Sequence, residues 1–114
     1  MIARVWRGWT SLPNAASYQE HFHAEVLGRL DTIDGFRGAQ LWRREQEGQV
    51  EFVAVTTFDS IEAVRTFAGS EYERAVVAPE ARRVLERFDE RCQHYEVAVA
   101  RSADLSQVVA EDSR

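Results

Sequence analysis

One short segment constrains the fold of this 114-residue chain more than any other. Residues 52–56, FVAVT, are apolar in almost unbroken succession and rich in β-branched side chains, which is typical of a β-strand. Because successive side chains of a strand point to opposite faces, both faces of this strand need a cover. One chain of this length cannot cover both, so the sequence predicts a homodimer in which a second copy covers one face.

The patterns around this segment alternate between the periods of strands and helices. Strands are expected at residues 2–10, 36–45, 50–58 and 93–100, and the second and third are joined by a hairpin turn. Amphipathic helices are expected at residues 15–33, 61–68 and 79–88, with a short helical piece at 71–77. The order βαββαβ predicts an α+β fold with a ferredoxin-like antiparallel sheet and helices on one face.

Length and composition indicate one domain, residues 1–100, followed by a loose acidic tail, residues 101–114. The net charge of −5 argues against a nucleic-acid partner, since such binding requires basic residues to neutralise phosphates. No segment reaches the ~20 apolar residues of a membrane helix, and the N-terminus does not resemble a signal peptide. With a single cysteine, Cys92, these features predict a cytoplasmic protein without a membrane partner.

The residues that could hold a metal or cofactor are few. His21 and His23 lie two apart on a predicted helix, so their side chains diverge and cannot share a metal ion. The third histidine, His94, has no carboxylate at a ligand spacing beside it. The glycines form no phosphate-binding loop. We therefore predict neither a metal site nor a cofactor, although a haem iron needs only one histidine.

The aromatic content is high for a small domain, with three Trp, three Tyr and six Phe residues. These rings either fill the core or line an apolar cavity between helices and sheet. In the second case a few polar groups, such as His94, Tyr72 or Arg43, would orient a flat ligand. Titratable groups concentrate at residues 88–97, where a helix is expected to lead into the last strand.

Four segments resemble the antibiotic biosynthesis monooxygenase-like family. They are residues 35–44 (GFRGAQLWRR), 60–64 with 67–69, 75–81 and 94–97, and the similarity spans residues 1–100. The resemblance implies a dimeric α/β barrel, in which two sheets meet face to face with helices outside. Some members of this family oxidise polycyclic aromatic phenols with dioxygen and no cofactor, whereas others bind and degrade haem.

The residues at the family's functional positions differ here. The haem-degrading branch pairs a tryptophan late in the second helix with a histidine further on, and this chain holds Phe67 and Val77 there. That branch also has an asparagine on the first strand, and Asn14 follows that strand instead. The phenol-oxidising branch uses a tryptophan and a tyrosine. Tyr72 matches the tyrosine, and Phe67 replaces the tryptophan.

The leading hypothesis is a cofactor-independent monooxygenase that acts on an aromatic or polyketide-like molecule in an apolar pocket. Tyr72 or His94 would hold or deprotonate a phenolic oxygen, and Arg43 would stabilise the anion. The expected substrate-binding residues, which pack against the rings, are Trp6, Phe67 and Trp42.

Two other readings stay open at this point. One is a non-catalytic dimeric module that binds a hydrophobic small molecule. The other is haem binding through His21 or His23.

Overall fold

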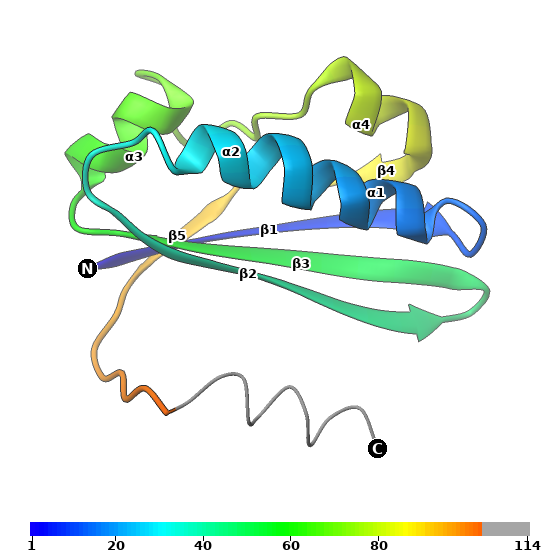
Figure 1. Cartoon of the computed structure of the whole chain (residues 1–114), viewed down its shortest axis with the longest axis horizontal. Coiled ribbons are helices and arrows are strands. Elements are labelled where there is room, and N and C mark those ends of the chain that lie inside the picture. Colours follow the sequence, from blue (N-terminus) through cyan, green and yellow to red (C-terminus); the bar gives the residue numbers. More distant parts are fainter. Residues whose placement is uncertain (104–114) are drawn as a thin grey trace.

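In the computed structural model, which describes residues 1–103, one antiparallel sheet is covered by helices on one face (Figure 1). Its strands are β1 (Ile2–Ser11), β2 (Phe36–Gln46), β3 (Gln49–Phe58), β4 (Leu85–Phe88) and β5 (Gln93–Glu96). The strand order is β2-β3-β1-β4, and β5 also pairs with β1. This is the ferredoxin-like arrangement with its last strand in two pieces, so the predicted α+β fold class is confirmed.

The helical layer begins with one continuous rod made of α1 (Ala15–His21), η1 (Phe22–Val26) and α2 (Leu27–Leu30). Its middle turn, η1, is a π-helix, and π-turns occur often at functional sites. Two shorter helices, α3 (Ile61–Ala68) and α4 (Pro79–Val84), complete the layer (Figure 1). No helix within residues 1–103 is long and apolar enough to cross a membrane.

The predicted helix at residues 79–88 is wrong in its second half. The helix ends at Val84, and residues 85–88 form β4 along β1, with Leu85 opposite Thr10 and Phe88 opposite Gly8. The apolar spacing of this segment fits a short helix and a short strand equally well. Backbone hydrogen bonding to the free edge of β1 decides in favour of the strand, which the local sequence does not reveal.

The predicted helical piece at residues 71–77 is also wrong. This segment runs beside residues 90–92: the Cys92 amide donates to the Glu73 carbonyl at 2.7 Å, and the Ala75 amide donates to the Glu90 carbonyl at 2.8 Å. The predicted last strand ends at Glu96 rather than at residue 100. Most of the predicted tail, from residue 104 onward, lies outside the described residues.

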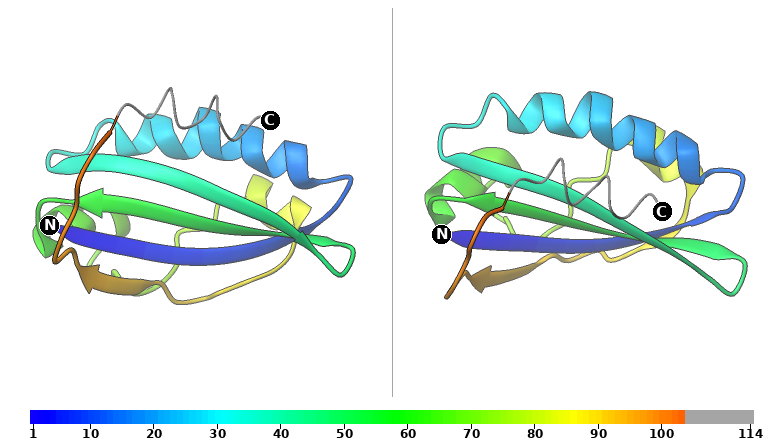
Figure 2. Two further views of the ribbon diagram at one scale, coloured as in Figure 1. Left: turned by 90° about the horizontal axis from the view of Figure 1, so that it is seen from below. Right: turned by 60° about the horizontal axis from the view of Figure 1, so that its bottom comes forward.

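The two faces of the sheet have different surroundings. On the face toward the helices, alternate residues of β3 are buried, including Phe52 and Ala54. The opposite face carries the half-buried Val53 and Val55, and no helix of the described residues lies over it (Figure 2). The strand is thus apolar on both faces, as predicted. The partner that would cover the second face stays a prediction.

Candidate functional site

A cavity of about 290 Å³ lies between the helical layer and the sheet. Its wall is formed by β1, β3, the helical rod, the end of α3 and the segment that leads into α4. Most of the lining residues are apolar or aromatic: Trp6, Tyr18, Phe22, Val26, Ala54, Phe67, Val76, Val77, Ala78 and Ala81. The remaining ones are polar or ionisable: Arg4, His21, Glu25, Arg29, Thr56 and Cys92. Such a mixture is typical of small-molecule sites.

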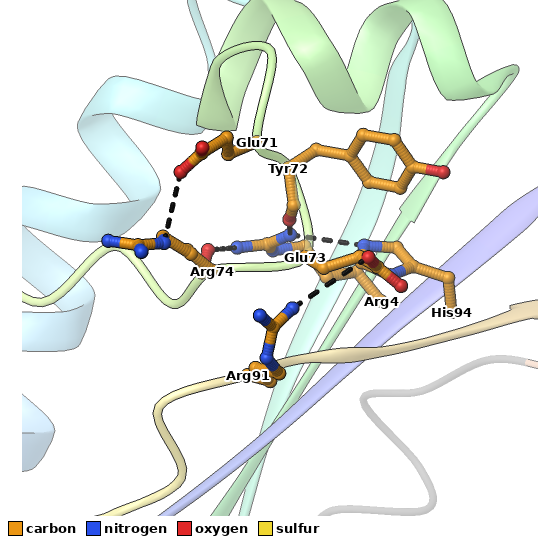
Figure 3. Close-up of polar contacts among 7 residues, drawn as sticks. All are labelled: Arg4, Glu71, Tyr72, Glu73, Arg74, Arg91 and His94. Carbon is orange, nitrogen blue, oxygen red and sulfur yellow. Dashed lines mark hydrogen bonds and ion pairs between the residues drawn. The ribbon is translucent and has the colours of Figure 1, made fainter.

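Arg4 is the most deeply buried charged group of this cavity, with 5% of its surface exposed. Side chains of β1 alternate between faces, so Arg4 points toward the helices with Trp6. Its Nη1 donates to the Tyr72 carbonyl and to His94 Nε2 (3.0 Å), and its Nη2 donates to the Arg74 carbonyl at 3.0 Å (Figure 3). Burial lowers the pKa of Arg4, and the nearby Cys92 partly offsets this.

Tyr72 and His94, two of the predicted catalytic residues, lie together behind Arg4. Their rings meet edge to face with centroids 5.1 Å apart. An arginine only donates hydrogen bonds, so His94 Nε2 accepts from Arg4 and its imidazole is neutral. Burial, and then the charge of Arg4, lower the pKa of His94. The structure therefore brings both residues to the site, but in contact with Arg4 rather than on the cavity wall.

Acidification is expected to destabilise the protein through His94. Its pKa is lower in the folded than in the unfolded chain, so the unfolded state binds the proton more tightly. The stabilisation by neutral His94 is complete above pH ~6.5 and is lost as the pH falls through the lowered folded pKa. The imidazolium would face Arg4, with only the weaker attraction of Glu73 to offset the repulsion.

The check is chemical denaturation of the wild type and of His94→Gln between pH 7.5 and 5. His94→Gln keeps a hydrogen-bond acceptor and should show a shallower loss of stability below pH 6.5. Equal pH dependence in the two proteins would contradict this role of His94.

Trp6 and Phe67, two of the predicted substrate-binding residues, both line the cavity. Two guanidinium groups lie near the Phe67 ring, with Cζ of Arg4 at 5.8 Å and Cζ of Arg29 at 4.7 Å from its centroid. The Trp6 indole donates to the Asp89 carbonyl at 2.8 Å. Gly8 makes room for this indole, because a Cβ at Gly8 would lie 2.5 Å from Trp6 Cη2.

Arg43 and Trp42 lie away from the cavity. Arg43, on the exposed part of β2, donates to Gln19 Oε1 at 3.0 Å and lies over the Phe52 ring. Trp42 is 54% exposed and projects from the opposite face of the sheet, where its indole donates to Gln40 Oε1. Of the six predicted site residues, Trp6 and Phe67 thus line the cavity, Tyr72 and His94 lie behind it against Arg4, and Arg43 and Trp42 are separated from it.

Sequence reasoning missed Arg4 and Tyr18 as site residues. Tyr18 is 4% exposed, and burial strongly raises the pKa of its hydroxyl, so the hydroxyl stays protonated. The sequence did indicate the direction of the Arg4 side chain. Arg4 lies an even number of residues from Trp6 and Thr10 on β1, so its side chain is on the same face as theirs, toward the core. Tyr18 was expected in the apolar stripe of the first helix, and nothing in that stripe distinguishes a cavity wall from a filled core.

Comparisons with solved structures address the fold directly. An antibiotic biosynthesis monooxygenase-like protein of Bacillus cereus superposes with a TM-score of 0.65 at 18% identity, covering 90% of this chain and 97% of that one. This chain has the antibiotic biosynthesis monooxygenase fold. The resemblance predicted from the sequence is thereby confirmed at the level of the fold. No model of a protein family matches the sequence, and no curated protein is significantly similar to it.

Two further proteins with the antibiotic biosynthesis monooxygenase fold have described activities. The haem degrader MhuD of Mycobacterium tuberculosis, with two haems bound in its active site, has a TM-score of 0.57 at 19% identity, covering 90% of this chain and 100% of that one. SnoaB, a cofactor-independent oxygenase from Streptomyces nogalater, has a TM-score of 0.55 at 15% identity, with coverage of 90% and 96%. At such identities the likeness concerns the fold and leaves substrate and reaction open.

Within this fold, the positions of Phe67 and Val77 are informative. Both residues line the cavity, at positions where the resemblance expects functional side chains.

Among residues 1–103, no group of three or more His, Cys, Asp or Glu residues could hold a metal ion.

Proposed function

We propose that this protein is a cofactor-independent monooxygenase that oxidises an aromatic or polyketide-like small molecule in the cavity. The observation that carries the proposal is the cavity itself, about 290 Å³ in volume and lined by aromatic rings beside a few buried polar groups. The fold shared with SnoaB, a cofactor-independent oxygenase, supports the reaction class. Trp6 and Phe67 would pack against the rings of the substrate.

The reaction needs a proton acceptor and dioxygen. An anthrone-like phenol loses a proton, and its carbanion passes electrons to dioxygen and forms a C–O bond. The resulting peroxide anion takes back the proton; loss of the remaining C–H proton then breaks the O–O bond, releases water and leaves a ketone, so one dioxygen supplies one oxygen to product and one to water. His94 already accepts a hydrogen bond from Arg4. We therefore assign the role of proton acceptor to His21 or Glu25, which line the cavity. His94 and Tyr72 instead position Arg4.

Oxygen uptake with a panel of anthrone-like phenols tests this function. The proposal predicts uptake of one dioxygen per ketone formed, at a rate proportional to the protein concentration. Uptake no faster than in protein-free buffer across the panel would contradict the monooxygenase proposal.

We also infer that the chain forms a homodimer through the helix-free face of its sheet. Val5 lies opposite Val55, and Trp42 lies opposite Val53 in the neighbouring row, so apolar side chains of three strands form a diagonal apolar patch. Trp42 and Tyr95 are 54% and 58% exposed, which is unusual for aromatic residues without a partner. A second copy placed sheet to sheet would cover this patch.

Trp42→Glu is expected to convert a dimer into a monomer, because it places a charge in the apolar patch. Light scattering after size exclusion measures the mass directly. Leu12→Glu is the control, since Leu12 is 46% exposed in the turn after β1 and lies outside this face. A monomeric wild type, or a Trp42→Glu protein that stays dimeric, would contradict the inferred interface.

The alternative is a non-catalytic dimer that binds a hydrophobic small molecule. It is favoured by Phe67 and Val77, which line the cavity and stand where the resemblance expects the tryptophan and histidine of the haem-degrading branch. Native mass spectrometry of protein from its own host distinguishes the two, because a retained, unoxidised ligand supports binding alone.

A third reading is haem binding through His21, which lines the cavity, or His23, which is exposed. It predicts a shifted Soret band when hemin is added.

A further inference from the structure

We propose that Arg4 makes this cavity a site for an aromatic anion, so that the ligand enters with a carboxylate, phenolate or enolate oxygen bound to the guanidinium. This inference rests on the proposed function in using the same cavity and adds the chemical class of the ligand. It is carried by the charge balance of Arg4, by its unused donors and by the rings beside it.

The charge of Arg4 has no carboxylate to balance it in the described part of the chain. Its three hydrogen-bond partners are two backbone carbonyls and a neutral imidazole. The two carboxylates on the adjoining loop pair outward, Glu71 with Arg74 at 3.0 Å and Glu73 with Arg91 at 3.8 Å (Figure 3). A charge that is 5% exposed and lacks a counterion costs substantial free energy, which a bound anion would recover.

Besides His94, Arg4 interacts with the ionisable residue Cys92, which does not supply a negative charge. Cys92 lines the cavity and is 6% exposed. Burial raises the pKa of its thiol, an effect that the charge of Arg4 only partly offsets. The thiol therefore stays protonated at neutral pH.

Arg4 also retains unused hydrogen-bond donors. A guanidinium has five N–H groups, and the three hydrogen bonds of Arg4 involve Nη1 and Nη2 only, so its Nε–H has no partner among residues 1–103. Within residues 1–103, every fully buried side-chain nitrogen or oxygen has a hydrogen-bond partner. Since Nε of Arg4 has none there, it must keep some surface accessible to solvent. Because Arg4 lines the cavity, we infer that this free edge faces it, as a planar fork suited to a carboxylate or phenolate oxygen.

The surroundings of Arg4 select a flat, apolar body for this anion. Phe67 lies 5.8 Å from the guanidinium carbon, and Trp6 follows two residues along the same strand. An adjoining hollow between α1 and α4 has the opposite character: it shares His21 and Glu25 with the cavity and carries two more acids, Glu20 and Glu80. The anion is therefore expected beside Arg4, away from these acids.

The test compares two ligands of the same shape, 2-naphthoate and the neutral 2-naphthamide, by calorimetric titration at pH 7.5. The wild type should bind the carboxylate at least about tenfold more tightly, since a charged hydrogen bond is worth about one such factor or more. Arg4→Met should lose this preference and Arg4→Lys should keep part of it. Arg43→Met is the matched control, because Arg43 lies outside the cavity, and should retain the full preference.

Arg4→Met also removes the hydrogen bonds to two loop carbonyls, which destabilises the loop. The deciding measurement is therefore the comparison of the two ligands on the wild type. If Arg4 were only a clamp for this loop, the wild type would bind both ligands equally. Equal affinities, or no binding of the carboxylate, would overturn the proposal. Neither titration requires turnover. Absent oxygen uptake with a retained carboxylate preference would therefore reject the monooxygenase and support the anion site.

Discussion

Ala54→Phe is expected to reduce 2-naphthoate binding and oxygen uptake by on the order of a hundredfold, equivalent to roughly 2.7 kcal/mol. Ala54 lies at the centre of β3, opposite Trp6 on β1, and its methyl group is part of the cavity wall. A benzyl group at this position would occupy the space that the ligand needs. The new ring enters an existing cavity, so the free energy of unfolding should fall by no more than about 1–3 kcal/mol.

Calorimetric titration and oxygen uptake measure this effect, with Ala16→Phe as the control. Ala16 lies on the exposed side of α1, so the same change there adds a ring outside the cavity. Ala16→Phe should bind and react like the wild type. If the Ala54→Phe protein is folded and binds the ligand normally, the cavity is not the binding site.

Phe58→Ala should have the largest effect on stability, about 3–5 kcal/mol. Phe58 is 0% exposed, and its ring lies 5.9 Å from that of Phe36 and 6.1 Å from that of Phe67. Its removal leaves a void behind the Phe67 side of the cavity. Since a domain of this size has roughly 5–15 kcal/mol in total, the loss should be visible as a large fall in the denaturation midpoint.

Urea denaturation at one fixed protein concentration measures this loss, because the proposed dimerisation would make apparent stability depend on concentration. Leu12→Ala provides the comparison: Leu12 is 46% exposed, and its truncation should cost less than about 0.5 kcal/mol. A loss below about 1 kcal/mol for Phe58→Ala would contradict the close packing of this core.

The fold could be predicted where periodicity and turn chemistry agree. The hairpin between β2 and β3 is an example: Glu47 and Gly48 both adopt positive φ, at 54° and 79°, as a tight hairpin turn requires. Residues 71–77 and 85–88 could not be predicted, because their conformation depends on pairing with distant segments. β4 exists only because β1 offers it a free edge, and local apolar spacing carries no information about that edge.

The site could be predicted in part. The aromatic residues Trp6 and Phe67 reach the cavity because their periodic positions face the helical layer. Arg43 was expected near a ligand, but β2 is an edge strand whose outer half is exposed, and only the strand order reveals this. Arg4 was missed because charge in a strand is usually taken as a sign of solvent exposure.

The most direct test of the cavity as the binding site uses the indole N–H signals of the three tryptophans in a ¹H–¹⁵N NMR spectrum. Trp6 lines the cavity, whereas Trp42 and Trp9 are outside it, Trp9 in contact with Arg87. Titration with 2-naphthoate should shift the Trp6 signal and leave the other two unchanged. If Trp42 or Trp9 shifts while Trp6 does not, the ligand binds on the helix-free face, and the account of the cavity is wrong.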